Sequence, residues 1–500
     1  MTLEDIIDAG RRVEHHRRWP RVIVPEARWI AIAQGVAAGA FTMLGLWAER
    51  DAVHMAVIDE TSGAIAVVTV ECANGTYPSV GKFHPPALRL ERAVQSLFGL
   101  VAQGLPDGRP WLDLGFWGVE HPLGEAAAAK SREAYKFLPA EGESLHQIPV
   151  GPVHAGIIEP GHFRFTAGGE TIVRLEQRLG YVHKGIESLM AGAPLEKAAR
   201  LAARTSGDST VAYSIAFAQA VEAALDIAVP ARALLLRALM AELERLANHF
   251  GDIGAICNDA SFSIMLAHCG VLREKTLRIA AACFGHRLMM DGVIPGGVAK
   301  DLPADAMVDL GAYTREVRRI FPQLVELYDN TASLQDRTVT TGIVRPELVK
   351  QFGAGGYVGR AAGRAFDARR KPGYAPYDQL QFEVPVLDAG DVNARVWVRI
   401  REVEQSLALI EQIAGRLSGG PVRAPVNPQG LREGLGLAEA FRGDVLVWLR
   451  LDGERVARCH LRDASWFQWP LLEVAIEGNI VADFPLCNKS FNCSYSGHDL

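Results

Sequence analysis

Residues 178–212 read RLGYVHKGIESLMAGAPLEKAARLAARTSGDSTVA, and the rest of the chain can be arranged around them. The first part has a polar helical pattern. His183 and Glu187 are four residues apart in it, so we expect both side chains on one helix face. The second part ends in the small polar turn RTSGDS, residues 204–209, which opens a long apolar helix from Thr210 onward.

The turn at residues 204–209 is rich in short side chains that carry oxygen. Ser206, Asp208 and Ser209 suit the capping of the helix that begins at Thr210, because their oxygens can accept its free N–H groups. A catalytic role is the alternative, but a serine beside an aspartate is common at turns and does not define a nucleophile triad. The sequence has no Walker or GxGxxG loop after a strand, so we expect no nucleotide site on this chain.

The composition favours a globular protein with more than one core. The 500 residues are 49% hydrophobic, which is enough for two or three domains. The formal net charge is −6 and no long Lys/Arg run occurs, so we expect no nucleic-acid partner. The seven cysteines form neither a CxxC pair nor a disulfide framework, which favours a reducing cytoplasm.

The sequence predicts no direct membrane span. The N-terminal residues, MTLEDIIDAGRRVEHH, are charged and lack the apolar core of a signal peptide. The most apolar run, residues 29–48, contains Gln34 and three glycines and changes character at Phe41. A membrane-spanning helix needs about 20 apolar residues. We therefore expect a helix followed by a buried strand, and any membrane contact should come through partner subunits.

We expect an α+β fold in two parts. Residues 1–145 contain alternating segments such as HMAVID (54–59), which indicate a small α+β domain. A linker over residues 126–147 leads into the second domain, residues 146–500. This domain opens with GPVHAGIIEPGHFRF (151–165), whose Gly-Pro and Pro-Gly pairs predict a hairpin.

The segment from Thr210 to Ala332 reads as a helical bundle. Glu242, Arg245 and His249 share one face of one of its helices. They could form an interhelical salt-bridge set, or a proton or redox-linked relay, since clustered titratable groups beside a buried cavity have shifted pKa values. Beside them runs a stripe at three- and four-residue steps, typical of a buried helix face: Leu236, Leu239, Leu243, Leu246 and Phe250.

More motifs follow in order along the chain: IPGGVAKDLP (294–303), DRTV (336–339), GRAAG (359–363) with Asp367 and Arg369, and FEVP (382–385). With the polar turn and the Glu242 helix, this series resembles the large subunits of [NiFe] hydrogenases, above all the energy-converting group of the formate-hydrogenlyase and hydrogenase-4 type. It equally resembles their relative, the quinone-site subunit of respiratory complex I. The resemblance implies a mainly α-helical large-subunit domain with small antiparallel sheets.

Residues 1–145 resemble the smaller hydrogenase-module subunit of complex I, which energy-converting hydrogenases often carry fused ahead of the large subunit. The Glu91–Arg92 helix and the Pro-Asp-x-Arg loop could dock this domain on its neighbours, or Glu91–Arg92 could be a weak surface ion pair. The matching residues are Pro78, His84, Ala87, Glu91, Arg92, Phe98, Gly99, Pro106, Asp107 and Arg109.

In the hydrogenases that this chain resembles, the turn supplies two nickel-binding cysteines and a tail motif Asp-Pro-Cys-x-x-Cys supplies two more. Ser206 and Ser209 stand at the first pair, and the best gap-free register puts Ser494 and Gly497 at the second. A serine hydroxyl is a hard donor with a pKa far above neutrality, so it does not replace a thiolate. We therefore expect no Ni-Fe centre and no metal on this chain.

The resemblance also assigns a surround to the lost centre, namely Arg204, Arg360 and Asp367. The tail cysteines, Cys487 and Cys493, read as ordinary tail residues. In the complex I subunit the hairpin carries a histidine at the quinone headgroup, and Ile158 stands at that place here. A quinone-like acceptor is therefore possible but lacks one of its main residues.

By resemblance, the chain is a peripheral subunit on the cytoplasmic side of the cell membrane, in a complex I-like, NADH dehydrogenase-like oxidoreductase that couples electron transfer to ion translocation. Its partners would be an iron-sulfur-cluster subunit and antiporter-like membrane subunits, with any NADH bound elsewhere. A non-catalytic scaffold is the alternative, and an active H2-evolving hydrogenase is a third. The expected relay comprises His183, Glu187, Glu242, Arg245 and His249.

Overall fold

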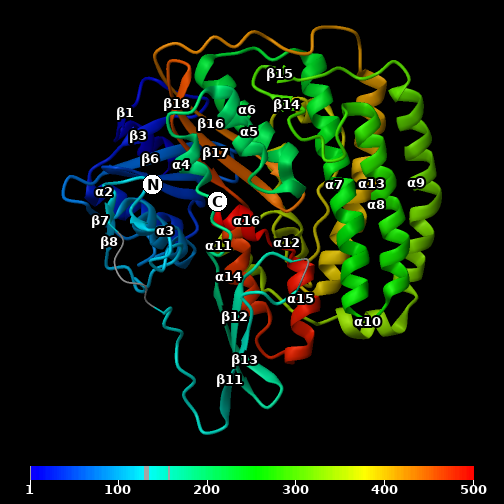
Figure 1. Cartoon of the computed structure of the whole chain (residues 1–500), viewed down its shortest axis with the longest axis horizontal. Helices are drawn as coiled ribbons and strands as arrows, with labels where there is room; N and C mark the ends of the chain where they lie inside the picture. The colour runs from blue at the N-terminus through cyan, green and yellow to red at the C-terminus, as the bar shows by residue number, and fades with distance from the viewer. Residues whose placement is uncertain (1, 129–133, 156–157) are drawn as a thin grey trace.

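The computed structural model describes residues 2–128, 134–155 and 158–500, and it has the predicted α+β fold (Figure 1). Long helices stand side by side in one half of the molecule, and the N-terminal residues form a sheet in the other half. A second sheet lies between them, and a third projects from one end. Residues 129–133 of the predicted linker lie outside the described residues.

The N-terminal part is built on a five-stranded sheet of order β1–β3–β6–β5–β4. The predicted helix and buried strand over residues 29–48 are confirmed, since α2 ends before β4 begins. No helix among the described residues is long and apolar enough to cross a membrane. The elements are α1 (Leu3–Asp8), β1 (Arg11–Arg12), β3 (Arg21–Ile23), α2 (Glu26–Ala37), β4 (Thr42–Glu49), β5 (Ala52–Ile58), β6 (Ile65–Glu71), β7 (Thr76–Pro78), α3 (Leu88–Phe98), β8 (Val101–Gln103), β9 (Val119–Glu120) and β10 (Ala127–Ala128).

The central sheet joins the two ends of the chain. Strands β16 (Leu431–Ala440), β17 (Gly443–Asp452) and β18 (Arg455–Arg462) are antiparallel neighbours. The short β2 (His16–Arg17) adds to β16 in parallel, with His16 opposite Glu433. The sheet is thus completed by a strand from the beginning of the chain.

Helix α6 (Thr210–Leu225) packs directly on β16, because this strand has glycine where the helix approaches. A Cβ atom at Gly434 would lie 2.0 Å from the carbonyl oxygen of Ala220, and one at Gly436 would lie 2.0 Å from that of Ala216. Only a residue without Cβ fits against a backbone at this distance. The close contact lets the apolar helix seal one face of the sheet.

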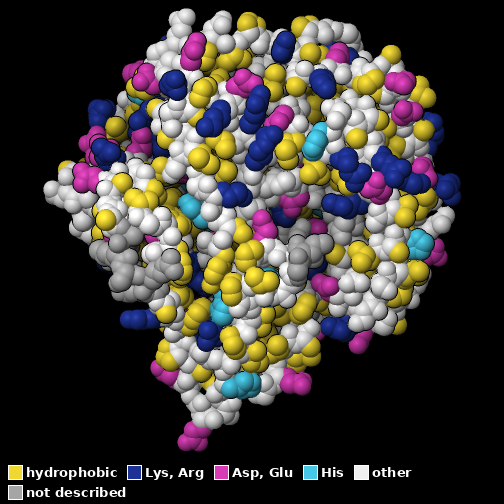
Figure 2. Space-filling model, viewed as in Figure 1, with side chains coloured by type: hydrophobic (Ala, Val, Ile, Leu, Met, Phe, Trp, Pro, Cys, Tyr) yellow, Lys and Arg dark blue, Asp and Glu magenta, His cyan; other side chains and the backbone are white. Residues whose placement is uncertain are grey.

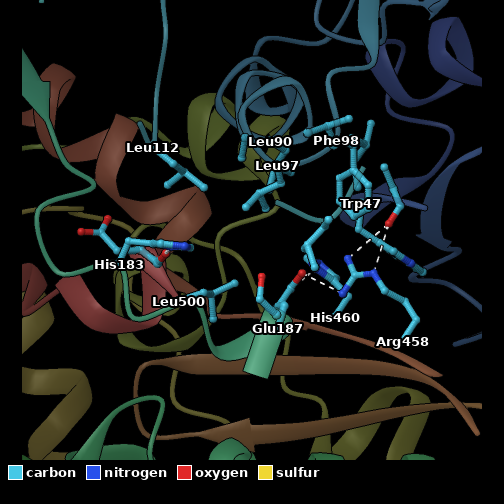
Figure 3. Close-up of a pocket in the computed structure, with 18 of the residues that line it drawn as sticks. Trp47, Leu90, Leu97, Phe98, Leu112, His183, Glu187, Arg458, His460 and Leu500 are labelled. Atoms are coloured by element: carbon cyan, nitrogen blue, oxygen red, sulfur yellow. Dashed lines mark hydrogen bonds and ion pairs between the residues drawn. The ribbon is translucent and has the colours of Figure 1, made fainter. Parts of the chain in front are cut away.

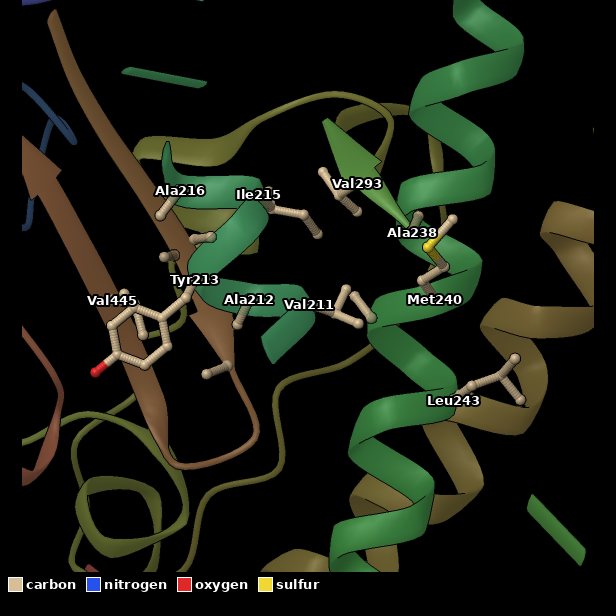
Figure 4. Close-up of a cluster of buried hydrophobic side chains, with 14 of the residues drawn as sticks. Val211, Ala212, Tyr213, Ile215, Ala216, Ala238, Met240, Leu243, Val293 and Val445 are labelled. Carbon is tan, nitrogen blue, oxygen red and sulfur yellow. The ribbon is translucent and has the colours of Figure 1, made fainter. Parts of the chain in front are cut away.

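The predicted helical bundle is confirmed, and it consists of α6, α7 (Ala231–Asp259), α8 (Ser263–Phe284) and α9 (Ala306–Asp329), with α13 (Val392–Arg416) beside them. Figure 4 shows Val211 of α6 next to Met240 of α7, with Ile215 of α6 facing Val293. The predicted apolar stripe forms the core of α7, since each of its members is fully buried: Leu236, Leu239, Leu243, Leu246 and Phe250.

Buried charges connect the N-terminal sheet to the central sheet. Glu433 is fully buried and accepts hydrogen bonds from Arg21 Nη1 at 2.6 Å and Arg450 Nε at 2.8 Å. Arg450 also pairs with Glu49 of β4 at 2.5 Å. The domain division at residue 145 stays a prediction. The parts before and after this residue share the central sheet and these ion pairs.

The predicted hairpin is present, because β11 (Leu145–Val150) and β12 (His162–Gly168) are antiparallel and β13 (Thr171–Arg178) extends their sheet. Hydrophobic side chains gather over this end of the molecule (Figure 2), among them the exposed Val153 and Val173. The remaining elements are α4 (Ile186–Met190), α5 (Leu195–Ala203), β14 (Val293–Ile294), β15 (Gly297–Val298), α10 (Ala332–Thr338), α11 (Pro346–Phe352), α12 (Gly356–Ala361), α14 (Ser465–Ala475), α15 (Phe484–Phe491), α16 (Tyr495–Asp499) and the short turns η1 (Pro85–Ala87), η2 (Gly207–Ser209), η3 (Arg369–Gly373), η4 (Tyr377–Gln379) and η5 (Val481–Asp483).

The prediction that His183 and Glu187 share a helix face is wrong. Helix α4 begins only at Ile186, because Gly185 adopts a left-handed conformation with φ of 67°. His183 therefore lies in the irregular segment before the helix, where a 3.6-residue period does not apply.

Candidate functional site

The polar turn and the C-terminal tail meet in the folded chain. The hydroxyl oxygens of Ser206 and Ser494 are 3.2 Å apart, and both residues are buried. Ser206 donates to Asp208 at 2.6 Å, and Ser494 accepts the N–H of Gly497 at 2.9 Å. Positions that are 288 residues apart in sequence thus form one small polar site, as the resemblance predicted.

Arg442, just beyond β16, binds this turn. Its guanidinium donates to both carboxylate oxygens of Asp208, at 2.9 and 2.5 Å, and to Ser209 Oγ at 3.2 Å. Its Nε donates to the carbonyl oxygen of Asn492 in the tail. Burial alone would raise the pKa of Asp208, but Arg442 lowers it to about 2. A fixed positive charge therefore ties the turn to the tail.

The side chains present do not fit a Ni-Fe centre. The hydroxyls of Ser206 and Ser494 are hard donors already engaged in hydrogen bonds. A guanidinium contacts Ser209 and would repel a divalent cation at that place. Burial raises the pKa of the Cys487 thiol to about 11 and raises that of Cys493 as well, so both stay protonated rather than thiolate.

Within the described part of the chain, no group of three or more His, Cys, Asp or Glu side chains is arranged to hold a metal ion. Cys493 instead lies 3.9 Å from the amide oxygen of Gln468. Gly497 has no side chain that could bind a metal, and a Cβ atom there would lie 2.7 Å from Asp463. The turn and tail are therefore packed as a hydrogen-bonded contact.

The predicted capping of α6 by the turn serines is wrong. Neither Ser206 nor Ser209 bonds the first N–H groups of the helix. Glu244 of α7 does so instead, accepting from the N–H of Val211 at 2.7 Å and of Ala212 at 3.2 Å. The serines are held by Asp208 and Arg442, which leaves the helix end to a carboxyl from a neighbouring helix. Burial raises the pKa of Glu244 to about 8.

The structure separates the three residues that were predicted to surround the lost centre. Arg204 lies at the surface, where its two Nη atoms donate to Asp291 at 2.7 Å. Arg360 and Asp367 are fully buried and belong to an ionic cluster between α7, α12 and α13. The three residues therefore do not form a common shell around the turn.

Glu242 lies at one side of this ionic cluster. Its carboxylate accepts from Arg369 Nη1 at 3.0 Å and from Arg245 Nε at 3.2 Å. The hydroxyls of Tyr377 and Ser406 complete its shell at 2.7 and 2.6 Å. Burial alone would raise the pKa of Glu242, but the two arginines lower it below its usual value.

His249 lies seven residues beyond Glu242, about two turns further along α7, and contacts the same cluster. Its Nε2 is 2.6 Å from Glu402 Oε2 of α13. The other oxygen of Glu402 pairs with Arg360 at 2.5 Å, and Arg360 also binds Glu439 at 2.9 Å. Burial lowers the pKa of His249, so the imidazole is neutral near pH 7.

A second set of buried contacts leads from α7 toward the serine turn. Asp252 pairs with Arg399 of α13 at 3.2 Å and with Lys489 of α15 at 3.2 Å. It also accepts from Asn492 Nδ2 at 2.9 Å. The backbone oxygen of Asn492 in turn accepts from Arg442. Polar contacts therefore run from the α7 helix to the turn.

His183 and Glu187 have other partners. Glu187 binds Arg458 at 2.8 Å and His460 at 2.7 Å on β18. Burial alone would raise the pKa of Glu187, but the charge of Arg458 and the contact with His460 lower it to about 2. His183 stacks on Trp117 and lies 2.7 Å from the backbone oxygen of Asp499. Figure 3 shows these polar groups on one side of a pocket whose other side is apolar.

The structure therefore divides the five predicted relay residues. Glu242, Arg245 and His249 lie in one ionic cluster, as their shared helix face predicted, whereas His183 and Glu187 line the pocket beside the N-terminal sheet. The interhelical salt-bridge interpretation of the first set describes its contacts well. A relay role stays a prediction.

Several residues of the cluster were not singled out from sequence. The most informative signal was on α13, where buried polar side chains recur at three- and four-residue steps and mark a polar helix face inside the core: Arg395, Arg399, Glu402 and Ser406. Two other members, Tyr377 and Glu439, come from a distant turn and strand and have no periodic signal. Arg369 was named only as part of a motif, with no partner assigned to it.

Comparisons with known proteins identify similar chains. The family model described as the 49 Kd subunit of respiratory-chain NADH dehydrogenase matches residues 259–433. Formate hydrogenlyase subunit 5 of Escherichia coli (strain K12) is 33% identical over 449 residues, covering 86% of this chain and 78% of that protein. Hydrogenase-4 component G of the same organism is 31% identical, with 86% and 77% covered.

An NADH-quinone oxidoreductase subunit from Desulfotalea psychrophila is 31% identical over 350 residues, covering 69% of this chain and 93% of that protein. Among solved structures, a chain of the membrane-bound sulfane sulfur reductase, an archaeal respiratory membrane complex, superimposes with a TM-score of 0.67. It is 24% identical, and the match covers 72% of this chain and 99% of that chain. The last similarity shows a shared fold.

Proposed function

Because this chain belongs to the family that contains formate hydrogenlyase subunit 5, hydrogenase-4 component G and the NADH-quinone oxidoreductase subunit from Desulfotalea psychrophila, we propose that it is a peripheral subunit of a complex I-like oxidoreductase without a Ni-Fe centre. In this role it lies on the cytoplasmic side of the membrane. An iron-sulfur subunit covers the serine turn, and antiporter-like membrane subunits lie below.

The observation that carries the proposal is the pairing of the serine turn with Arg442. Where the hydrogenases have metal-binding thiolates, this chain has the Ser206–Ser494 contact and a guanidinium bound to Ser209 and Asp208. These groups hydrogen-bond to one another. The polar contacts from Asp252 of α7 to the turn, and the ionic cluster at His249 on the same helix, support a role in passing charge or conformational change into the subunit. Exposed apolar residues at the projecting sheet support burial against partners (Figure 2).

The first test is the metal content of the purified complex. We expect no stoichiometric nickel and no H2-dependent dye reduction, because hard, hydrogen-bonded hydroxyls do not hold nickel and iron. One nickel per complex together with H2 turnover would establish the hydrogenase alternative instead.

Electron transfer to a quinone-like acceptor competes with a scaffold that transmits conformational change. The test is His249→Ala in the intact complex, with the exposed His268→Ala on α8 as a matched control. If the chain acts in electron transfer, acceptor reduction falls at least about tenfold in His249→Ala while the subunits stay assembled. Unchanged acceptor reduction and ion transport in that variant would support the scaffold.

A further inference from the structure

The buried ionic cluster carries unequal numbers of opposite charges. None of its seven members is more than 2% exposed. Each is linked to another by an ion pair: Glu242 to Arg245 and Arg369, Asp367 to Arg360 and Arg369, and Glu402 and Glu439 to Arg360. Four carboxylates thus share three guanidiniums.

An uncompensated charge in such surroundings is unfavourable, and a buried acid then takes up a proton instead of staying ionised. His249 does not balance the count, because burial lowers its pKa and leaves it neutral near pH 7. One of the four carboxyl groups is therefore expected to be protonated.

Among the four carboxyl groups, Glu439 has the fewest positively charged or histidine partners of its own. Its Oε1 accepts from Arg360, which also serves Glu402 and Asp367, and its Oε2 accepts only from the N–H of Ala368 at 2.9 Å. Burial and the charge of Asp367 raise the pKa of Glu439 to about 7. The groups that face it from the surrounding elements are Arg360, Asp367, Arg369, Tyr374, Arg245 and Asp444.

An open cleft is lined by two tyrosines that bond residues of this cluster. It lies between the N-terminal arm at Arg17 and Arg18, the helix α6, and the segment that carries Tyr374 and Tyr377. The Tyr377 hydroxyl donates to Glu242 at 2.7 Å, and the Tyr374 hydroxyl accepts from the N–H of Glu439 at 3.2 Å. Tyr377 thus lies between the cleft and the Glu242 carboxylate, and Tyr374 lies between the cleft and the backbone of Glu439.

We propose that Glu439 holds a proton in the resting protein and exchanges it with solvent through the cleft at Tyr374 and Tyr377. On release, the carboxyl O–H bond breaks, the carboxylate remains paired with Arg360, and water in the cleft accepts the proton. In the proposed function, Glu439 would be the group of the relay that holds the proton. This use of the proton rests on the proposed function, whereas its presence on Glu439 does not.

Infrared titration of the purified full chain tests the site. We expect a protonated-carboxyl component that disappears with a midpoint near the pKa of about 7 and is missing from Glu439→Gln in the difference spectrum against wild type. The contributions of Glu91 and Glu244, whose pKa values burial also raises, remain in that variant. The difference component is the band assigned to Glu439.

The matched control is Glu433→Gln, which removes another fully buried carboxyl of β16 whose partners Arg21 and Arg450 keep it ionised. This control should leave the band in place. A Glu439→Gln spectrum that lacks no carboxyl component relative to wild type would overturn the proposal.

The charge count has its own test in Glu402→Gln, which leaves three carboxylates for three guanidiniums. We expect the midpoint of the band to fall by at least about one pH unit, a tenfold change in proton affinity. An unchanged midpoint would overturn the count, even if Glu439→Gln failed to fold.

Hydrogen–deuterium exchange of the band tests the route. Exchange should slow at least about tenfold in Tyr377→Phe combined with Tyr374→Phe, and stay unchanged in Tyr328→Phe, a buried tyrosine of α9 bonded to Asn393. Equal rates in all three proteins would refute access through the cleft. None of these spectra needs an electron donor. A complex that failed to couple electron transfer to ion transport would therefore overturn the proposed function without changing the infrared results.

Discussion

Glu242 and its neighbours show what single residues reveal before a structure is known. The shared face of Glu242, Arg245 and His249 could be predicted because helix periodicity fixes it. The partners that give these residues their chemistry could not, since Glu402 and Arg369 are 153 and 127 residues away from the side chains they bind. The capping prediction for the turn serines is wrong for a similar reason, because a capping carboxyl from α7 is invisible in the local pattern.

Glu244 predicts a pH dependence of stability. Its pKa is about 8 when folded and about 4.5 when unfolded, so the folded chain binds the extra proton and loses stability as pH rises between these values. Glu244→Gln mimics the protonated form and should remove this loss, at most about 1.4 kcal/mol for each pH unit. Urea unfolding at several pH values measures it.

The control for this prediction is Glu274→Gln. Glu274 is a surface residue paired with Arg278 and Arg287, and its carboxyl is already ionised throughout this range because those arginines lower its pKa to about 2. Its variant should therefore follow the wild-type slope between about pH 5 and 8. If Glu244→Gln had that same slope, the Glu244 carboxyl would be ionised in the native state.

The cysteines predict a simple reactivity pattern. All seven are free and buried, and burial raises the thiol pKa of the tail pair, Cys487 and Cys493. The native chain should therefore show no thiol that reacts with a disulfide reagent within minutes at about pH 7.5, and all of them should react after denaturation. Rapid labelling of Cys493 in the native chain would indicate an accessible thiolate beside the turn.

At the level of elements, the contact of α6 with β16 depends on glycine. Gly436→Ala would place a methyl group 2.0 Å from the Ala216 carbonyl oxygen, so we expect a loss of about 1–3 kcal/mol from overpacking. Gly415→Ala is the control, because no atom lies within 4 Å of a Cβ there and the residue is inside α13. That variant should gain about 0.5–1 kcal/mol.

Thermal or urea unfolding of both glycine variants provides the comparison. A Gly436→Ala protein as stable as wild type would mean that α6 can move away from the sheet without cost.

Elements with a strong periodic pattern were predictable, and those that depend on distant contacts were not. The apolar stripe of α7 follows from its three- and four-residue spacing. The strands at residues 42–71 follow from short hydrophobic runs, which are buried along almost their whole length. Strand β2 is only two residues long and exists because β16 lies beside it. The spacing of His183 and Glu187 favours a helix, whereas the left-handed Gly185 between them prevents one.

For the whole molecule, the N-terminal part and the rest are expected to unfold together. One buried core contains Trp29 of α2, Phe163 of β12 and Trp469 of α14. Glu433→Ala leaves Arg21 without its carboxylate inside the protein, which should cost about 3–5 kcal/mol. Calorimetry should show a single transition at a lower temperature.

The matched control is the exposed Glu454→Ala, on the turn that follows β17. It should change stability by no more than about 0.5 kcal/mol. Two separate transitions, with only one of them moved by Glu433→Ala, would mean that residues 1–145 fold independently.

The parallel pairing of β2 with β16 has a consequence for how the chain is made. Arg21 and its partner Glu433 are 412 residues apart, and ribosomes add roughly 5–20 residues per second, so the arm waits about 20–80 s for its partner. During that interval strand β2 has no partner strand, and Arg21 lacks its acceptor Glu433. A nascent chain of this length is thus a substrate for chaperones that shield open strands, and their absence should reduce the yield of this protein more than that of a chain whose sheets close locally.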